Sequence, residues 1–146
     1  MNTIIVRTAQ MKDLPEIASL YKGFWGESSN LEQMQTRFEL LKQDKRYCLL
    51  VAEHTCEVVG TIFGVVCDEL YGNCLPFMVM EDLIVKESHM RTGVASLLMA
   101  QLEEFAKFMK CTQLQFITES NRTDAIRFYE RIGYDSSKNV GFKKKL

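Results

Sequence analysis

The sequence has 146 residues, of which 47% are hydrophobic and 25% are charged, and its formal net charge at pH 7 is −1. This length and composition fit one globular domain with one continuous core, so we expect a single domain over residues 1–146. The near-neutral charge excludes any general electrostatic attraction to nucleic acid or to an anionic membrane, and the longest apolar stretch, VVGTIFGVVC at 58–67, is too short to span a bilayer.

Hydrophobic periodicity and turn residues predict ten elements along the chain. In chain order they are a strand at 3–9, helices at 11–24 and 29–44, strands at 46–54, 57–70 and 77–86, a helix at 93–110, a strand at 112–118, a helix at 122–133 and a final strand at 140–146. Antiparallel neighbours come before a strand–helix–strand crossover in this order. The pattern therefore predicts a mixed α/β sheet.

Capping residues mark where the first two helices begin. Asp13 and Glu16 have the spacing of a capping box, and so do Ser29 and Glu32. We therefore expect Asp13 and Ser29 to be the N-caps of these helices.

The cysteines indicate a reducing compartment. Their number is odd, and the sequence has neither a C-x-x-C motif nor a Cys/His pair at metal-ligand spacing; they are Cys48, Cys56, Cys67, Cys74 and Cys111. We expect reduced thiols, no metal site and a cytoplasmic location.

The stretch HMRTGVAS (89–96) joins a predicted strand to the longest predicted helix. A helix N-terminus presents free N–H groups, and Gly93 would let a diphosphate approach the backbone closely. Arg91, Thr92 and Ser96 would add polar contacts. The alternative is a plain helix start in which Thr92 is the N-cap and Arg91 is a surface residue.

Two adjacent carboxylates, Glu81 and Asp82, interrupt the strand that precedes this loop. A charge in a strand fit for burial is costly unless it is paired or used. Because strand side chains alternate, the two should point to opposite faces. The alternatives are a strand end or a salt bridge.

The segment SNRTDAIRFYERIGY (120–134) places Asn121 at a strand-to-helix junction. Phe128 and Ile132 fit the core stripe of the helix, which leaves Tyr129 rotated about 100° from Phe128. Tyr129 is therefore expected to be half-buried.

Together these segments resemble the GCN5-related N-acetyltransferase (GNAT) superfamily. The cofactor motif of that family is similar to MEDLIVKESHMRTGVASLLM, its second motif to NRTDAIRFYERIGY, and its start to IIVRTAQMKDLPEIASLY. The resemblance implies a central, mostly antiparallel sheet with one splayed parallel pair, flanked by about four helices. Met90 stands where the family usually has Gln or Arg, so Arg91 would have to take its place in part.

The resemblance further implies acetyl-CoA as cosubstrate, held between the strands at 77–86 and 112–118. The implied contacts are the main chain of Leu83, Ile84 and Val85, the pyrophosphate loop Met90, Arg91, Thr92, Gly93, Val94, Ala95 and Ser96, and Asn121, Ala125 and Phe128 of the second motif.

The implied reaction is direct transfer of an acetyl group from a thioester to an amine. Tyr129 occupies the position of the proton donor to the departing thiolate. A carboxylate would take the proton of the amine, and we expect Glu81 in this role because it shares a strand face with Leu83 and Val85, with Asp82 in reserve.

The acceptor site is implied to lie around residues 24–30 and 68–74. It would have an acidic and aromatic lining made of Trp25, Glu27, Asp68, Glu69 and Tyr71, which favours a small cationic amine of the polyamine or aminoglycoside kind. Two alternatives stay open: acetylation of a protein N-terminus or lysine, and a non-catalytic CoA-binding module. A homodimer is an expectation from the family.

Overall fold

The computed structural model describes residues 3–146, which divide into two compact units at residues 1–115 and 116–146. The elements of the first unit are β1 (Ile5–Thr8), η1 (Met11–Asp13), α1 (Leu14–Trp25), α2 (Leu31–Leu41), β2 (Tyr47–His54), β3 (Glu57–Cys67), β4 (Phe77–Val85), η2 (Glu87–His89), α3 (Val94–Phe108) and β5 (Leu114–Gln115). The second unit contains α4 (Thr123–Arg131).

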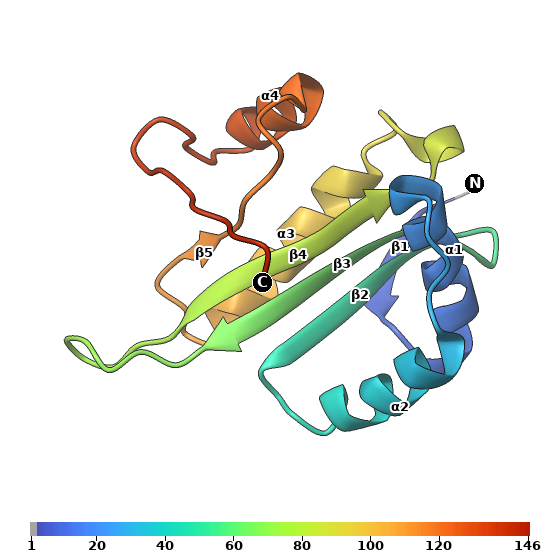
Figure 1. Cartoon of the computed structure of the whole chain (residues 1–146), viewed down its shortest axis with the longest axis horizontal. Coiled ribbons are helices and arrows are strands. Elements are labelled where there is room, and N and C mark those ends of the chain that lie inside the picture. Colours follow the sequence, from blue (N-terminus) through green and yellow to red (C-terminus); the bar gives the residue numbers. More distant parts are fainter. Residues whose placement is uncertain (1–2) are drawn as a thin grey trace. The chain divides into compact units, whose positions relative to one another are not determined.

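The strands form one five-stranded sheet in the order β1-β2-β3-β4-β5 (Figure 1). The first three pairings are antiparallel, and β5 pairs with β4 in parallel. The predicted mixed sheet with four helices and one parallel pair is thus confirmed.

Helices cover both faces of the sheet. On one face α3 packs closely, because Gly60 and Gly64 of β3 leave room for Leu98 and Leu102; a Cβ at Gly64 would lie 2.6 Å from Leu102. The other face carries α1 and α2 and a second cluster of buried side chains: Ala9, Leu14, Ile17, Leu20, Phe38, Val51, Val58 and Ile84. Side chains on the face covered by α1 and α2 therefore point toward α1.

A buried ion-pair network fixes the start of α1 against the sheet. Asp13, whose side chain is 3% exposed, receives two hydrogen bonds from the Arg7 guanidinium at 2.7 and 2.9 Å. Arg7 also donates to Glu53 on β2, and the Gln10 N–H donates to Asp13. The network ties β1, β2 and the first helical turn together.

Asp13 is the N-cap of α1, as predicted, but neither predicted capping box forms. The Asp13 side chain caps the short η1 turn through Gln10, and Glu16 accepts a hydrogen bond from the Val58 N–H instead of closing a box with Asp13. At the second helix the N-cap is Asn30, one residue after the predicted Ser29. Tertiary partners outcompete the local bonds in the first case.

Two predicted strands differ from the structure. Only Leu114 and Gln115 of the predicted 112–118 strand are paired, and 140–146 forms no strand. Val140 and Phe142 are largely exposed there. The alternating apolar residues that predicted a strand therefore have no partner strand to pair with. Gly141 nevertheless lies against Ile117 within the second unit.

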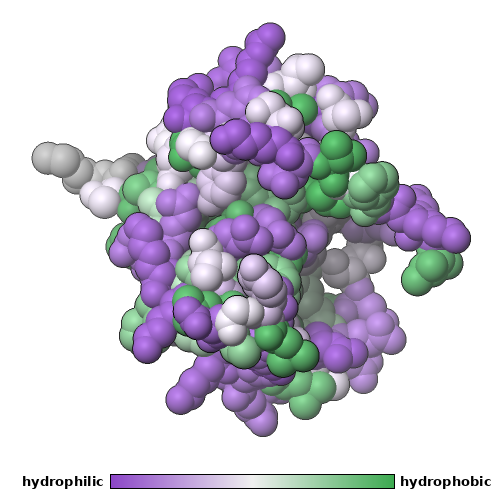
Figure 2. Space-filling model, turned by 90° about the vertical axis from the view of Figure 1, so that its left-hand side faces the viewer, coloured by the Kyte–Doolittle hydropathy of each residue, from purple (hydrophilic) through white to green (hydrophobic). Residues whose placement is uncertain are grey.

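None of the helices in residues 3–146 combines the length and the hydropathy needed to cross a bilayer. The face in Figure 2 is mostly hydrophilic, with hydrophobic residues in small groups between polar ones.

Candidate active site

The two carboxylates lie at a bulge of β4, beyond the point where its pairing with β5 ends. The β3–β4 register pairs Thr61 with Ile84 but Phe63 with Glu81, so β4 has one residue more than β3 between these pairs. Asp82 sits at this extra residue with a φ of 56°, in the left-handed region that residues other than glycine rarely adopt. The strict alternation used to place Glu81 on the face of Leu83 and Val85 is therefore wrong.

The bulge separates the environments of the two carboxylates. Glu81 is exposed, whereas Asp82 is half-buried. Burial, and then the charge of Glu81, raise the pKa of Asp82 above its ordinary value. Burial and the charge of Asp82 likewise raise the pKa of Tyr21 on α1. Asp82 is therefore near enough to α1 for its charge to act on Tyr21, and its pKa is moved toward the range useful for a general base.

Aromatic side chains extend from Tyr21 along the last turns of α1. Its ring packs edge-on against Trp25 at a centroid distance of 5.4 Å, and Trp25 packs against Phe24 at 5.1 Å. Trp25 is 53% exposed and Glu27 follows it at the surface. Aromatic faces and a helix C-terminus both favour a cation, so this end of α1 suits a protonated amine.

The other predicted acceptor residues lie elsewhere on the first unit. Asp68, Glu69 and Tyr71 belong to the loop between β3 and β4, which Figure 1 shows at the far tip of this hairpin. Asp68 lies 3.8 Å from Arg46, and Glu69 accepts hydrogen bonds within the loop. Asp82 comes five positions after Phe77 along β4, a rise of about 17 Å. The single acidic mouth expected from sequence is thus divided into two parts.

The loop before α3 presents its backbone to open space. Arg91 and Gly93 have φ angles of 61° and 92°, and an added Cβ at Gly93 would meet nothing within 4 Å. The first hydrogen bond of α3 runs from the Leu97 N–H to the Gly93 carbonyl. The preceding N–H groups, at Val94, Ala95 and Ser96, are therefore free for an anion, as at any helix N-terminus.

Side chains of this loop have different roles from those expected. Thr92 is not the N-cap of α3; its hydroxyl donates to the His89 carbonyl at 2.6 Å, and Gly93 is the N-cap. The Val94 side chain is buried against Gly60. Met90 is 54% exposed, and Arg91 and Ser96 are exposed. Arg91 is thus the cation that the loop itself offers.

The main chain of Leu83, Ile84 and Val85 is paired on one side only. Ile84 and Val85 pair with β3, whereas the pairing of β4 with β5 stops at Val79. The parallel pair therefore covers two residue pairs and leaves the rest of that β4 edge without a strand among the described residues. Such an edge can bind an extended ligand by strand-like hydrogen bonds.

In the second unit Tyr129 is the buried residue of α4, while Phe128 is half-buried, which reverses the expected core stripe. The ring of Tyr129 packs against Phe116, Phe128 and Tyr134. Burial raises the pKa of its hydroxyl, and the charge of Arg122 partly offsets this. Asn121 is exposed and Ala125 half-buried.

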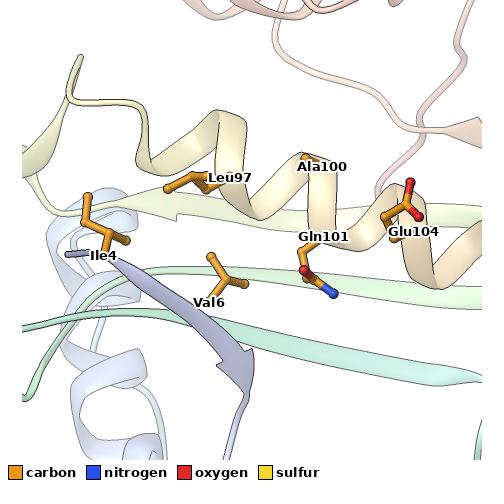
Figure 3. Close-up of a pocket in the computed structure, with 6 residues that line it drawn as sticks. All are labelled: Ile4, Val6, Leu97, Ala100, Gln101 and Glu104. Carbon is orange, nitrogen blue, oxygen red and sulfur yellow. The ribbon is translucent and has the colours of Figure 1, made fainter.

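A shallow hollow of about 270 Å³ lies on the α3 face, away from the carboxylates. Figure 3 shows Val6 of β1 and Ile4 just before it, facing Leu97, Ala100, Gln101 and Glu104 of α3. The one carboxylate among these residues, Glu104, forms an ion pair with Lys107. Across residues 3–146 no three His, Cys, Asp or Glu side chains are placed to hold a metal ion.

Sequence reasoning missed the bulge at Asp82 and the role of Tyr21. The sequence signal for the first was the ED pair inside an apolar strand; Tyr21 read as an ordinary member of a helical stripe.

A half-paired β4 edge, a carboxylate at a bulge and a helix N-terminus open to an anion all lie in the first unit. The family follows from comparison, since the model of the acetyltransferase (GNAT) family matches residues 14–134. The chain belongs to this family. No curated protein matches the sequence significantly.

Solved structures similar to this chain support the same fold. A transcriptional regulator from Bacillus halodurans C-125 is 26% identical, with a TM-score of 0.88 and coverage of 99% of this chain and 100% of that chain. A glucosamine-6-phosphate N-acetyltransferase from Arabidopsis thaliana is 18% identical, with a TM-score of 0.86 and 99% of both chains covered. AAC(6')-Iy in complex with the bisubstrate analog CoA-S-monomethyl-acetylneamine is 18% identical, with a TM-score of 0.83 and 99% of both chains covered.

Gly93→Val is expected to weaken CoA binding at least tenfold, because the side chain would fill the open space beside the free N–H groups. The positive φ also costs about 1–2 kcal/mol of stability. Gly72→Val is the matched control, since Gly72 has a φ of 60° and equally open surroundings. Calorimetric titration with CoA should find weakened binding for the first variant alone; equal affinities would remove the loop from the cosubstrate site.

Proposed function

We propose that this protein is an acetyl-CoA-dependent N-acetyltransferase that acts on a small cationic amine. The observation that carries the proposal is the half-buried Asp82 at the β4 bulge. β4 ends three residues later, at Val85, and the chain then passes through η2 to the N-terminus of α3, which is open to an anion.

The residues present fit a CoA molecule. The N–H groups of Arg91–Ser96 and the Arg91 guanidinium would hold the pyrophosphate, and this needs no side chain at Met90. The β4 edge at Leu83–Val85 would pair with the amide-bearing arm. Asn121, Ala125 and Phe128 of the second unit would contribute further contacts. Acetyl-CoA supplies the activated acetyl group.

The chemistry needs a base because an alkylamine has a pKa near 10.4 and is protonated at neutral pH. Asp82, directly or through one water, would take the ammonium proton, and the free amine nitrogen would form the C–N bond as the C–S bond breaks. Tyr129 would give its proton to the departing thiolate, and the second proton that the nitrogen loses as the amide forms would restore the Tyr129 hydroxyl, directly or through water. Glu81, exposed beside Asp82, would attract the cation.

The acceptor is proposed to bind at the end of α1. Tyr21 and Trp25 offer aromatic faces, and Asp82, Glu81 and Glu27 offer negative charge. A second acidic group, Asp68 and Glu69, follows Cys67, which pairs with Phe77 about 17 Å along β4 from Asp82. A separation on this scale suits an elongated polycation. This arrangement supports a polyamine-like or aminoglycoside-like acceptor.

Tyr129→Phe is expected to lower kcat by about 10- to 100-fold, because it removes the proton donor to the thiolate. The KM for acetyl-CoA should change little. Tyr134→Phe, in the same ring cluster, is the control and should keep wild-type turnover. An unchanged kcat in Tyr129→Phe would show that another donor protonates the thiolate.

A panel of amines assayed for CoA release tests the function. It should contain polyamines, aminoglycosides, amino sugars and lysine peptides, with mass spectrometry of the acetylated product. The proposal predicts turnover with polycationic small amines. Turnover with peptides alone would replace the acceptor class by proteins, and binding of CoA without turnover on any amine would favour a non-catalytic module.

A further inference from the structure

The two histidines of the chain, far apart in sequence, contact each other at the end of the sheet that carries the loop before α3. His54 is the last residue of β2, and His89 ends η2. The Nδ1 atom of His54 lies 2.9 Å from the Nε2 atom of His89, and the rings meet edge-on at a centroid distance of 5.0 Å. The mechanism proposed above uses neither of them.

His89 lies at the centre of the turn that leads into the loop before α3. Its N–H donates to the Lys86 carbonyl at 2.8 Å, and its own carbonyl accepts the Thr92 hydroxyl. Arg91 and Gly93, with their left-handed backbone, follow within four residues. A displacement of the His89 ring would therefore also move the N–H groups that would hold the pyrophosphate.

The contact between the rings requires a particular proton count. At 2.9 Å one nitrogen must carry a hydrogen and the other a lone pair, whichever way round. This holds when both rings are neutral or when one is charged, but two charged rings would place two N–H groups against each other. Imidazole is the side chain that changes charge between about pH 5 and 8.

The charged groups around the pair are Glu57 on β3 and Lys86 before η2. Lys86 donates to Glu57, and this ion pair is a second contact between the β2–β3 hairpin turn and the segment that precedes α3. The pKa of Glu57 is lowered, first by this hydrogen bond, which outweighs burial, and also by the charges of His89 and His54. Ser88 Oγ lies 2.9 Å from the remaining nitrogen, Nδ1, of His89.

We propose that His54 is a positioning residue for the pyrophosphate loop, which acts through His89 and releases it when both imidazoles are protonated. This rests on the proposed function, because the loop matters only if it holds CoA. Cofactor affinity should therefore fall in acid by more than the titration of the CoA phosphates explains.

Substituting asparagine for His54 tests the hydrogen bond to His89 separately from the protonation of the imidazole. The terminal atoms of asparagine occupy the place of the imidazole Nδ1, and they can pair with His89 in either charge state. His54→Asn should therefore keep the wild-type Kd for CoA at pH 7.5 and hold the loop at pH 5.5. His54→Ala should bind CoA about fivefold more weakly at both pH values, the usual effect of one hydrogen bond. Cys56→Ser, in the same turn, is the control and should match wild type.

The experiment is calorimetric titration with CoA at pH 7.5 and 5.5, together with imidazole nitrogen NMR of the free protein. The ratio of the wild-type Kd to the His54→Asn Kd cancels the titration of CoA itself; it should rise from about 1 to about 5 between the two pH values. NMR should show one donor and one acceptor nitrogen in the pair at pH 7.5. A constant ratio, or unaffected binding in His54→Ala, would overturn the inference while leaving the proposed function intact. No binding of CoA by the wild type, with the NMR pair present, would instead overturn the proposed function and the role of the loop with it.

Discussion

Asp82→Asn should lower kcat by at least about 100-fold, the usual contribution of a positioned general base. The amide has the same shape but cannot accept the ammonium proton. Because the burial that raises the pKa of Asp82 also penalises its charge, the variant should unfold at the same temperature as wild type or a higher one. Initial rates with a saturating amine, and a melting curve, measure both effects.

Glu81→Gln is the matched control, one residue away on the same bulge. Removing the Glu81 charge should lower the pKa of Asp82, so the acid limb of the rate profile should move to lower pH. The plateau rate should stay within about threefold of wild type, far below the loss expected from removing a base. The reverse pattern, a large loss in Glu81→Gln and a small one in Asp82→Asn, would make Glu81 the base.

Asp13→Ala should cost about 2–3 kcal/mol of unfolding free energy, the scale for losing hydrogen bonds to a charged group, because the Arg7 guanidinium is a quarter exposed and keeps Glu53 as a partner. The substitution leaves Arg7 with Glu53 alone and leaves the Gln10 N–H without its acceptor. Urea unfolding followed by circular dichroism measures the loss. Asp44→Ala breaks the exposed pair with Arg46 and should leave the midpoint nearly unchanged. A small change in Asp13→Ala would mean that the network is replaceable.

The ion pair of Asp13 with Arg7 also predicts how the stability of the protein depends on pH. Burial alone would raise the pKa of Asp13, but the hydrogen bonds from Arg7 and from the Gln10 backbone outweigh it and hold the pKa below its ordinary value. Its contribution is therefore complete above the ordinary carboxyl pKa of about 3.9 and is lost as the pH falls through the lower folded value. Asp13→Ala should lose this dependence.

Most of the fold could be predicted because its elements are amphipathic. The helix predicted at 93–110 is α3 (Val94–Phe108), and the strand predicted at 77–86 is β4 (Phe77–Val85). The ends were less certain because Ser29 and Asn30 are both good caps, each followed three residues later by Glu or Gln. The last strand was wrong because alternation shows that a segment suits a sheet, not that a partner strand is present.

The candidate site was predictable as a set of residues but not as a geometry. Glycine, arginine and hydroxyl residues before a helix marked the loop at 90–96, and the structure leaves its backbone open. The bulge at Asp82 arises from the pairing of two strands, so no local pattern encodes it. The contact of His54 with His89 joins positions 35 residues apart, and only the folded sheet brings them together.

Thermal unfolding with and without acetyl-CoA tests the central claim most directly. A cosubstrate at 100 times its Kd should add about 2.7 kcal/mol of stability, which raises the Tm of a chain of this length by roughly 5–10 °C. Pantetheine, which lacks the pyrophosphate, should give a much smaller rise, and Gly93→Val should lose the rise with acetyl-CoA. An unchanged Tm of the wild type at millimolar acetyl-CoA would contradict the account.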